Sequence, residues 1–387
     1  MQYRRFGRLD WEVSALGFGA MRLPLTGGDP AGVDVSESVR LVRYAIDHGV
    51  NYLDTAYPYH AGQSEKVVGQ ALQQGYRKKV KLATKLPARR VQSAGDFDRI
   101  FNEQLERLQT DRLDFYLLHG LNRQRWPKLR DLGVLHWAEA QMARGRFDHL
   151  GFSFHDGFDV FKEIIGGYDN WTLCQVLYNY MDVAYQAGSS GVEYAANKGL
   201  AVVAMEPLRG GALSGKPPEA VAKIWSRASV DLSPVEWALS WVWNHPGVST
   251  ALSGMTTMEQ LVDNLGIASR LGAGTLSQCD LEVVAMVRDA YGALSPIPCS
   301  NCGYCLPCSN GVQIPDIFKI YNETKTCGDL KMGLHRYRGP GGLEEEQRAD
   351  RCTECGECLE SCPQEIPIIG WLKKASELFS AGNSLPP

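Results

Sequence analysis

The sequence predicts a parallel (β/α)8 barrel, a TIM barrel, over residues 1–295 and a small cysteine-rich domain over residues 296–387. Short apolar or β-branched runs alternate with helical stretches throughout the first part, which is the pattern of such a barrel. Nine of the eleven cysteines then crowd into the residues from 299 onward. The composition therefore changes at the segment SPIPC (295–299), where we expect the domain boundary.

Eight runs along the first part have the length and composition of buried strands. They are VSALGFG (13–19), VNYLDTA (50–56), VKLATKL (80–86), LDFYLLHG (113–120), DHLGFSFH (148–155), LCQVLYNY (173–180), LAVVAMEPL (200–208) and VSTALSG (248–254). Helical periodicity separates them, in Glu37–His48, Phe97–Leu108, Leu135–Arg144, Tyr185–Lys198 and Pro234–Asn244. A doubly wound sheet is the alternative, but it needs a glycine-rich phosphate turn after an early strand, and GFGAM (17–21) does not fit GxGxxG.

The composition excludes several other classes of protein. A hydrophobic fraction of 44% with 22% charged residues is typical of a soluble globular chain. The net charge of −4 gives no reason to expect a nucleic-acid partner. The N-terminus lacks the apolar core of a signal peptide, and no run approaches the ~18 apolar residues of a membrane span. We therefore expect no membrane association and a cytoplasmic location.

Polar residues recur where the predicted strands end, which is where active sites form in such barrels. These residues are Asp54, Lys85, His119, Ser153, His155, Gln175, Asn179 and Glu206. A single polar residue at a strand end is usually a cap or a turn former. Six strands that end in this way indicate a functional site.

At these motifs the chain resembles the aldo-keto reductase superfamily, over residues 1 to about 295. The opening MQYRRFGRLDWEVSALGFGAMRLP resembles its N-terminal hairpin and first strand, and DTAYPYHAGQSEKVVGQAL (54–72) resembles its DTAxxYGxSExxxGxAL motif. The resemblance implies a catalytic tetrad of Asp54, Tyr59, Lys85 and His119. His60 departs from the family, in which glycine is usual, and this predicts a differently shaped loop after the tyrosine.

These residue types suit the reduction of a carbonyl group by hydride transfer. Negative charge develops on the carbonyl oxygen and must be stabilised and then protonated. A phenol with its ordinary pKa of ~10 is a weak acid at neutral pH, but a neighbouring ammonium stabilises the phenolate. Lys85 would supply that charge to Tyr59, Asp54 would pair with Lys85, and His119 would orient the carbonyl. The alternative is a structural ion pair at the barrel end with Tyr59 as a packed loop aromatic.

The hydride requires a nicotinamide donor, because no side chain can supply one. The resemblance implies that Ser153 and Gln175 bind the carboxamide, with Asn179 close by. Met205 stands where an aromatic residue often stacks on the ring, and Phe154 where asparagine is usual. A capping role for Ser153 and a core role for Met205 are the alternatives. The remaining candidates toward the nicotinamide and pyrophosphate are Gly19, Met21, Arg22, Pro207, Leu208, Arg209 and Gly211.

The sequence differs from the family most clearly in the predicted binding site for the adenosine end of the cofactor. A lysine and an arginine commonly bind the 2′-phosphate of NADP, and Gly254 and Gln260 align with them. Neither residue can pair with a phosphate dianion, so NADP and NAD both stay open. The candidates for holding the adenosine are Gly254, Met255, Thr256, Gln260, Asp263 and Asn264. The substrate would be a small carbonyl compound or its alcohol, with Arg22 or Trp126 lining the pocket.

The tail contains two cysteine runs with the spacing of iron–sulfur ligands. They are Cys299, Cys302, Cys305 and Cys308, and then Cys352, Cys355, Cys358 and Cys362. The second run has the bacterial ferredoxin spacing C-x2-C-x2-C-x3-C-P, in which the fourth cysteine serves the other of two [4Fe-4S] clusters. By this analogy Cys362 joins the first three cysteines of the first run, and Cys308 joins the second run.

The first run departs from that spacing by one residue, and Ser309 stands in place of proline. Structural zinc is the alternative ligand, although zinc sites usually pair separated CxxC motifs. Cys327 lies between the runs and is interpreted as a free or packing cysteine. Barrel and tail together resemble a bacterial and archaeal branch of the superfamily with a ferredoxin-like α-helical domain.

The role of the clusters has three interpretations. They relay electrons to or from a redox protein partner, or they are structural and brace the barrel or an oligomer contact. In the third, the chain is a nicotinamide-binding sensor without turnover, which the complete tetrad disfavours. Because a cluster passes one electron whereas a nicotinamide passes a hydride, coupling normally needs a flavin, for which the sequence shows no motif.

Overall fold

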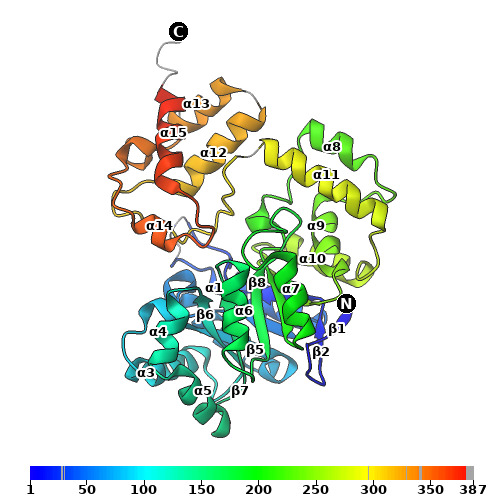
Figure 1. Cartoon of the computed structure of the whole chain (residues 1–387), viewed down its shortest axis with the longest axis vertical. Helices are drawn as coiled ribbons and strands as arrows, with labels where there is room; N and C mark the ends of the chain where they lie inside the picture. Colours follow the sequence, from blue (N-terminus) through cyan, green and yellow to red (C-terminus); the bar gives the residue numbers. More distant parts are fainter. Residues whose placement is uncertain (28, 30, 295, 328, 340–341, 381–387) are drawn as a thin grey trace. The chain divides into compact units, whose positions relative to one another are not determined.

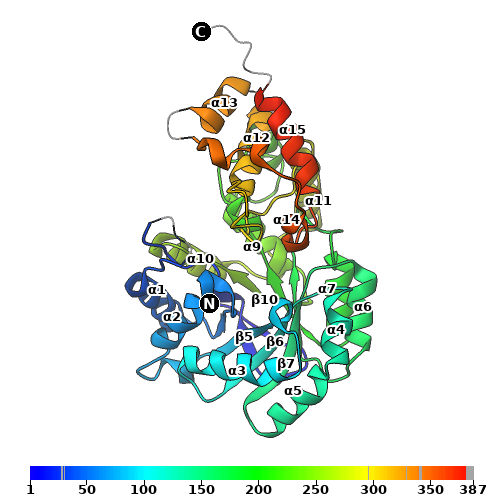
Figure 2. The same cartoon turned by 90° about the vertical axis from the view of Figure 1, so that its left-hand side faces the viewer.

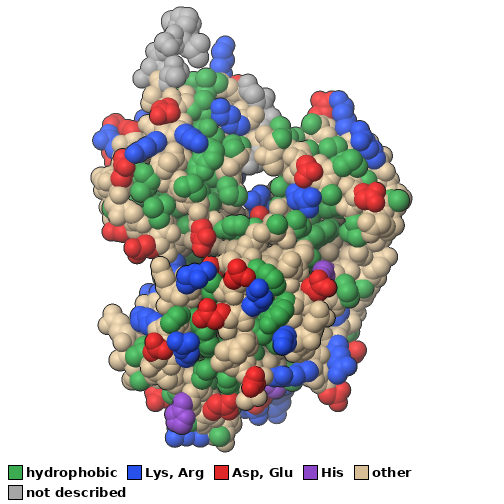
Figure 3. Space-filling model, in the orientation of Figure 1, with side chains coloured by type: hydrophobic (Ala, Val, Ile, Leu, Met, Phe, Trp, Pro, Cys, Tyr) green, Lys and Arg blue, Asp and Glu red, His purple; other side chains and the backbone are tan. Residues whose placement is uncertain are grey.

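The computed structural model describes residues 1–27, 29, 31–294, 296–327, 329–339 and 342–380. The chain forms two compact units. The barrel unit comprises Met1–Leu208 and Val235–Ser277, and the second unit comprises Arg209–Pro234 and Gln278–Pro387. Acidic and basic side chains are interspersed over the face shown in Figure 3. Among the described helices, none combines the length and apolar character that crossing a membrane requires.

Eight parallel strands close into a barrel (Figure 1), which confirms the predicted fold class. In barrel order they are β10 (Val248–Ser253), β3 (Leu16–Gly19), β4 (Tyr52–Asp54), β5 (Lys81–Pro87), β6 (Leu113–Leu121), β7 (Phe147–Phe154), β8 (Leu173–Leu177) and β9 (Ala201–Met205). Each lies within, or within one residue of, one of the eight predicted runs. A hairpin of β1 (Tyr3–Arg5) and β2 (Glu12–Ser14) precedes them, as the resemblance implied.

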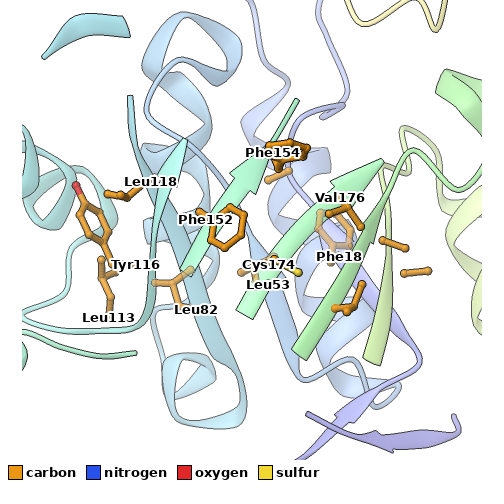
Figure 4. Close-up of a cluster of buried hydrophobic side chains, with 14 of the residues drawn as sticks. Phe18, Leu53, Leu82, Leu113, Tyr116, Leu118, Phe152, Phe154, Cys174 and Val176 are labelled. Atoms are coloured by element: carbon orange, nitrogen blue, oxygen red, sulfur yellow. The ribbon is translucent and has the colours of Figure 1, made fainter. Parts of the chain in front are cut away.

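Strand alternation divides the apolar side chains into two clusters. Side chains on the outer strand faces pack against the surrounding helices, as Phe152 and Phe154 do against Phe161, with 5.8 and 5.0 Å between ring centroids. Figure 4 shows Phe152, Phe154 and Val176 among the side chains of this cluster. The inner faces form a smaller cluster. There Phe6, just after β1, lies 5.7 Å from Tyr52 and 5.0 Å from Phe115 between ring centroids. The hairpin therefore fills the inside of the barrel near the beginning of β4.

Helices surround the barrel (Figure 2). They are α1 (Val35–Asp47), α2 (Gln63–Ala71), α3 (Gly95–Leu108), α4 (Arg125–Asp131), α5 (Val134–Ala143), α6 (Phe158–Gly166), α7 (Gly188–Asn197), α9 (Pro234–Asn244) and α10 (Met258–Arg270), with short 3-10 turns η1 (Tyr59–Gly62), η2 (Tyr76–Lys79) and η3 (Ala88–Arg90). Four of the five predicted helices begin and end within two residues of the prediction. The helix predicted from Tyr185 begins only at Gly188, because Gln186 and Gly188 both have φ of +55° and cannot extend a right-handed helix backward.

The described part of the second unit is helical. It contains η4 (Arg209–Gly211), α8 (Glu219–Trp225), α11 (Gln278–Leu294), α12 (Ile314–Cys327), α13 (Leu330–Arg338), η5 (Glu345–Gln347), η6 (Ala349–Arg351), α14 (Glu357–Ser361) and α15 (Ile368–Ser380). Helix α8 packs against α11, where the buried carboxylate of Asp280 accepts hydrogen bonds from the amide and hydroxyl of Ser229. The cysteine-rich segment has its own apolar core, in which the rings of Tyr337 and Phe379 stack at 4.3 Å.

Candidate active site

The four tetrad candidates lie together at the carboxyl ends of neighbouring strands. Asp54 ends β4, Lys85 lies near the end of β5, and His119 near the end of β6. Each lies two residues beyond an inward-facing member of the inner cluster, namely Tyr52, Ala83 and Leu117. Since strand side chains alternate with a period of two, all three polar groups point to the inside of the barrel, one layer above its apolar core.

The ammonium of Lys85 is the centre of this arrangement. It is 0% exposed and donates to Asp54 Oδ1 at 2.5 Å, to the Thr55 carbonyl at 2.8 Å and to the Tyr59 hydroxyl at 3.4 Å. These three acceptors use the three N–H donors of the group. The second carboxylate oxygen of Asp54 accepts from Gln175 Nε2 at 2.5 Å. Burial raises the pKa of Asp54, while Lys85 and Gln175 oppose that rise.

Tyr59 begins η1, and the backbone after it takes an unusual course. His60, Ala61 and Gly62 have φ of +52°, +51° and +87°, so three successive residues occupy the left-handed region. This explains why glycine suits position 60, because side chains rarely adopt that conformation. His60 adopts it nonetheless, and its Nε2 accepts a hydrogen bond from the Leu23 amide at 3.1 Å. The side chain thus joins the tyrosine loop to the segment after β3.

His119 faces Tyr59 edge to face, with 5.9 Å between ring centroids and an angle of 85° between the planes. Burial lowers the pKa of His119 well below its ordinary value, and the positive charge of Lys85 adds to this effect. The charges of His155, Arg125 and Arg89 act in the same direction. His119 is therefore a neutral imidazole at physiological pH, with one N–H available as a donor.

A buried polar network behind Lys85 was missed from the sequence. Glu65, 0% exposed, accepts from Thr84 Oγ1 at 2.7 Å and from Gln104 Nε2 at 2.6 Å. Gln104 Nε2 also donates to the Lys85 carbonyl at 3.1 Å. Burial raises the pKa of Glu65, and these hydrogen bonds together with Arg107 oppose the rise. The network fixes the backbone of β5 where it carries Lys85, and the Ser-Glu pair of the 54–72 motif was its only signal in the sequence.

The nicotinamide candidates Ser153 and Gln175 lie side by side, because they are register partners on β7 and β8. Ser153 Oγ accepts from the Gly120 amide at 2.7 Å, which leaves its own O–H to donate. Gln175 Oε1 is buried and has no hydrogen-bond partner among the described residues. A buried acceptor of this kind fits the NH2 group of a carboxamide. Met205 ends the neighbouring strand β9.

The side chain of Asn179 makes hydrogen bonds to its own loop and to the segment after β9. Its Nδ2 donates to Asp182 Oδ2 at 2.9 Å and to the Glu206 carbonyl at 3.2 Å. Its Oδ1 accepts from the amides of Met181 and Asp182 at 3.0 and 3.1 Å. These contacts hold the segment after β8 to the segment after β9. The structure therefore gives Asn179 a positioning role in the loop.

The adenosine candidates gather at the end of β10 and the beginning of α10. Thr257 caps α10 by accepting from the Gln260 amide, and Gln260 Oε1 accepts from the Thr256 amide at 2.8 Å. Asn264 Nδ2 donates to Ser253 Oγ at 3.0 Å. Met255 is buried, whereas Gly254 and Asp263 are exposed.

Arg22 lies over Gly254. A Cβ at Gly254 would lie 3.0 Å from Arg22 Cβ and 3.3 Å from its Cγ and Cδ, so a larger side chain there would displace the arginine. The Thr256 hydroxyl donates to the Arg22 carbonyl at 3.3 Å. The structure thus places the Arg22 side chain at Gly254, where the sequence lacks the cationic residue that is common in the family.

The remaining candidates for binding the cofactor or the substrate lie partly in the barrel unit and partly in the second unit. Gly19 ends β3, and a Cβ there would lie 3.5 Å from the Ser253 carbonyl. Met21, Pro207 and Leu208 belong to the barrel unit, while Arg209 and Gly211 belong to η4 of the second unit. Trp126 is only 1% exposed, and its ring lies 5.9 Å from that of Trp171. The side chain of Trp126 packs in the cluster between the strands and the helices, and its place at the substrate pocket stays a prediction.

Candidate cluster cavities

The cysteines of the tail surround two cavities in the second unit. Cys299, Cys302, Cys305 and Cys362 line one of them, whose remaining walls include Ile314, Phe318, Ile366 and Ile368. Cys308, Cys352, Cys355 and Cys358 line the other, which Cys305 also borders. Among the described residues, no three His, Cys, Asp or Glu side chains converge closely enough to hold a single metal ion. The thiols instead enclose space.

The pKa shifts of the thiols divide the cysteines into the same two groups. Burial raises the pKa of Cys305, and Cys302, Cys299 and Cys362 raise it further. Burial likewise raises the pKa of Cys358 to about 11, with contributions from Cys352, Cys308 and Cys355. Four thiols around each cavity, each of which would be stabilised as a thiolate by a nearby cation, fit a bound group that carries positive iron. Cys279 is exposed, and the side chain of Cys327 lies outside the described residues.

Known proteins resemble both parts of the chain. The aldo/keto reductase family matches residues 15–280, and the 4Fe-4S dicluster domain matches residues 298–366. The methylglyoxal reductase YeaE of Escherichia coli is 30% identical over 71% of this chain and 93% of its own. The uncharacterized oxidoreductase YrpG of Bacillus subtilis is 27% identical over 75% of this chain and 96% of its own.

Two solved structures share the barrel. An aldo-keto reductase of Bacillus halodurans in its holo form is 26% identical, with a TM-score of 0.62 over 74% of this chain and 96% of that one. An aldo-keto reductase of Klebsiella pneumoniae in complex with NADPH is 26% identical, with a TM-score of 0.59 over 74% of this chain and 95% of that one. The chain belongs to the aldo/keto reductase family of oxidoreductases and carries a C-terminal 4Fe-4S dicluster domain.

Proposed function

We propose that the barrel interconverts a small carbonyl compound and its alcohol, with NADP or NAD as the hydride carrier and Tyr59 as the acid/base. The observation that carries this proposal is the Lys85 ammonium, which contacts both Asp54 and the Tyr59 hydroxyl in a buried site. A positive charge beside the phenol stabilises the phenolate, so Tyr59 releases its proton more readily.

The roles follow from the geometry of the site. A nicotinamide held by Ser153 and Gln175 would supply or accept the hydride at the carbonyl carbon. In the reducing direction Tyr59 gives its hydroxyl proton to the carbonyl oxygen, which completes the alcohol. Neutral His119 donates a ring N–H toward the same oxygen and orients it. Lys85, held by Asp54, stabilises the phenolate that remains.

The described residues fit a nicotinamide. Gln175 Oε1 offers a buried acceptor and Ser153 an O–H donor on the adjacent strand, which together suit a carboxamide. NADPH in the Klebsiella relative supports a dinucleotide in this fold. A nicotinamide-binding sensor without turnover would need no acid/base, and the arrangement around Tyr59 favours an enzyme.

For the cofactor we infer that Arg22 supplies the cation that Gly254 and Gln260 lack. Its side chain covers Gly254, at the position where the family commonly has a lysine for the 2′-phosphate. A guanidinium pairs with a phosphate through two parallel hydrogen bonds. The inference favours NADPH over NADH.

In the second unit we propose two [4Fe-4S] clusters. Cys299, Cys302, Cys305 and Cys362 would hold one, and Cys308, Cys352, Cys355 and Cys358 the other, in line with the two groups of thiols. Electron relay to a redox protein is the first role, and the exposure of Cys355 supports it. Packing of six cluster cysteines against the apolar core favours the alternative, a structural role. Cysteines in this number, crowded into one segment with the spacing of metal ligands, favour a reducing compartment, the cytoplasm.

Anaerobic turnover of full-length protein tests the proposal. Aldehyde reduction would be measured with NADPH and with NADH, before and after the clusters are reduced by a one-electron donor. Reduction that depends on Tyr59 supports the reductase. A rate that changes with the redox state of the clusters supports relay, whereas a rate indifferent to that state supports the structural role.

A further inference from the structure

Arg125 lies beside His119, at the end of the barrel that carries the tetrad. Its Nη1 donates to the carbonyl of Gly120, the residue after His119, at 2.7 Å. Gly120 has φ of +65°, and a Cβ there would lie 3.3 Å from Arg125 Nη1 and 3.9 Å from His155 Cδ2. The guanidinium and the His155 ring thus flank the same glycine, next to the imidazole that orients the carbonyl.

The loop that carries Arg125 is held in place by side chains. Asn122 Oδ1 accepts from the amides of Gln124 and Arg125 at 3.1 and 2.8 Å. Asp156 Oδ2 accepts from the Arg123 amide at 2.7 Å. These bonds join the end of β6 to the end of β7, so the position of the guanidinium is set before any ligand binds.

The charge of Arg125 has no acidic partner. The side chain is partly buried, and in the described part of the barrel unit no carboxylate lies within 4.0 Å of its guanidinium. Burial lowers the pKa of Arg125 to about 10, and the positive charge of Arg89 contributes to this shift. Arg89 belongs to η3, which packs against β6 and α4.

A comparison with Arg107 shows why the lack of a carboxylate near Arg125 in the described barrel unit is unusual. Arg107, also partly buried, pairs with Glu65 and Glu103. Removing a guanidinium from water without an acidic partner is costly. Asp156, which holds the same loop, has its two oxygens turned to the Arg123 and Gly157 amides. A ligand oxyanion would offset this cost.

We propose that Arg125 is an anion subsite beside His119, and that the substrate is a carbonyl compound carrying a carboxylate or phosphate. This inference rests on the proposed reductase function and narrows its substrate class. The guanidinium fork would bind the oxyanion while His119 and Tyr59 hold the carbonyl oxygen, so both ends of a short substrate are fixed.

The test compares two aldehydes of equal chain length in full-length protein, succinic semialdehyde and butanal. Arg125→Gln is expected to lower kcat/KM for succinic semialdehyde by about 10- to 100-fold, mainly through KM, and to leave butanal within about twofold. Arg125→Lys should retain part of the preference, because it keeps the charge and loses the fork. Arg123→Gln is the matched control, an exposed arginine two residues away that should change neither aldehyde. Equal loss with both aldehydes, or no wild-type preference for the anionic one, overturns the subsite.

A binding measurement separates this inference from the reductase assignment. Succinate, which has no carbonyl to reduce, would be titrated by calorimetry into protein saturated with NADP+. Binding by the wild type that Arg125→Gln abolishes supports the subsite even if no aldehyde is reduced, in which case only the reductase function fails. Turnover of both aldehydes without succinate binding keeps the reductase and refutes the subsite.

Discussion

Lys85 Nζ donates a hydrogen bond of 3.4 Å to the hydroxyl of Tyr59, and both side chains are buried. The distance is long for such a bond, and the shorter contact of 2.5 Å joins the same ammonium to Asp54. The lysine is thus anchored by the carboxylate and presented to the phenol. This division of roles leads to separate expectations for the three residues.

Tyr59→Phe removes the proton donor and is expected to lower kcat for aldehyde reduction by about 10²- to 10⁴-fold, the usual range for a general acid. The affinity for NADPH, measured by fluorescence titration, should stay within about twofold. Tyr57→Phe is the matched control, since the Tyr57 hydroxyl donates to Glu103 at 2.9 Å. Unchanged turnover in Tyr59→Phe would reject the tetrad.

Lys85→Met leaves the Asp54 carboxylate buried without its cation. Breaking a buried pair costs about 3–5 kcal/mol, which in a domain of this size lowers Tm by roughly 6–20 °C. The double variant Asp54→Asn, Lys85→Met removes both charges and should recover much of that loss. Thermal melts of the three proteins test this, and a double variant as unstable as the single one would show that the pair is not coupled.

The pH dependence of stability should reflect His155. Burial lowers its pKa from 6.5 to about 4, so between these values the unfolded chain binds a proton that the folded one does not. The folded state therefore loses stability as the pH falls from about 6.5 to about 4. His155→Gln removes this contribution, and its Tm should fall less than that of the wild type between pH 7 and pH 5. An equal fall in both proteins contradicts a neutral His155 in the folded state.

Cofactor selection should depend on Arg22. Arg22→Gln is expected to weaken NADPH binding by about 10-fold, the value of one charge-assisted contact, and to leave NADH within about twofold. Fluorescence titration of both dinucleotides gives the ratio. Arg144→Gln, an exposed arginine at the end of α5, is the control. Equal effects on NADPH and NADH would mean that Arg22 does not contact the 2′-phosphate.

Iron content tests the cluster ligands. Two [4Fe-4S] clusters give about eight iron and eight sulfide per chain after anaerobic purification, and zinc in their place would reject the cluster proposal. Cys308→Ala should leave about four iron and expose Cys352, Cys355 and Cys358 to iodoacetamide while Cys362 stays protected. Alkylation of Cys299, Cys302 and Cys305 instead, with Cys352, Cys355 and Cys358 protected, would show that the ligands follow each run in sequence. Cys279→Ala should change nothing.

The barrel and the gathering of polar residues at one end of it could be predicted from the sequence because both depend on local signals, whereas the tetrad was implied by the resemblance to a family. Alternating apolar runs define strands whose inward positions repeat every two residues, so Asp54, Lys85 and His119 had to reach the same end once the strands were parallel. The spacing of the cysteines likewise predicted the cluster domain from the sequence alone.

Other features depend on contacts between residues far apart in the chain, which no local pattern records. Three such contacts appear only in the tertiary structure. The Arg22 side chain lies over Gly254, Asn179 hydrogen-bonds within its own loop, and the Trp126 ring packs against that of Trp171. The tertiary structure also left Arg125 beside His119 without an acidic partner in the described barrel unit. The sequence by itself determined which chemical groups the barrel presents at its catalytic end, because strand periodicity is local. Their charge states and partners were decided by burial and packing, which arise only when the strands close.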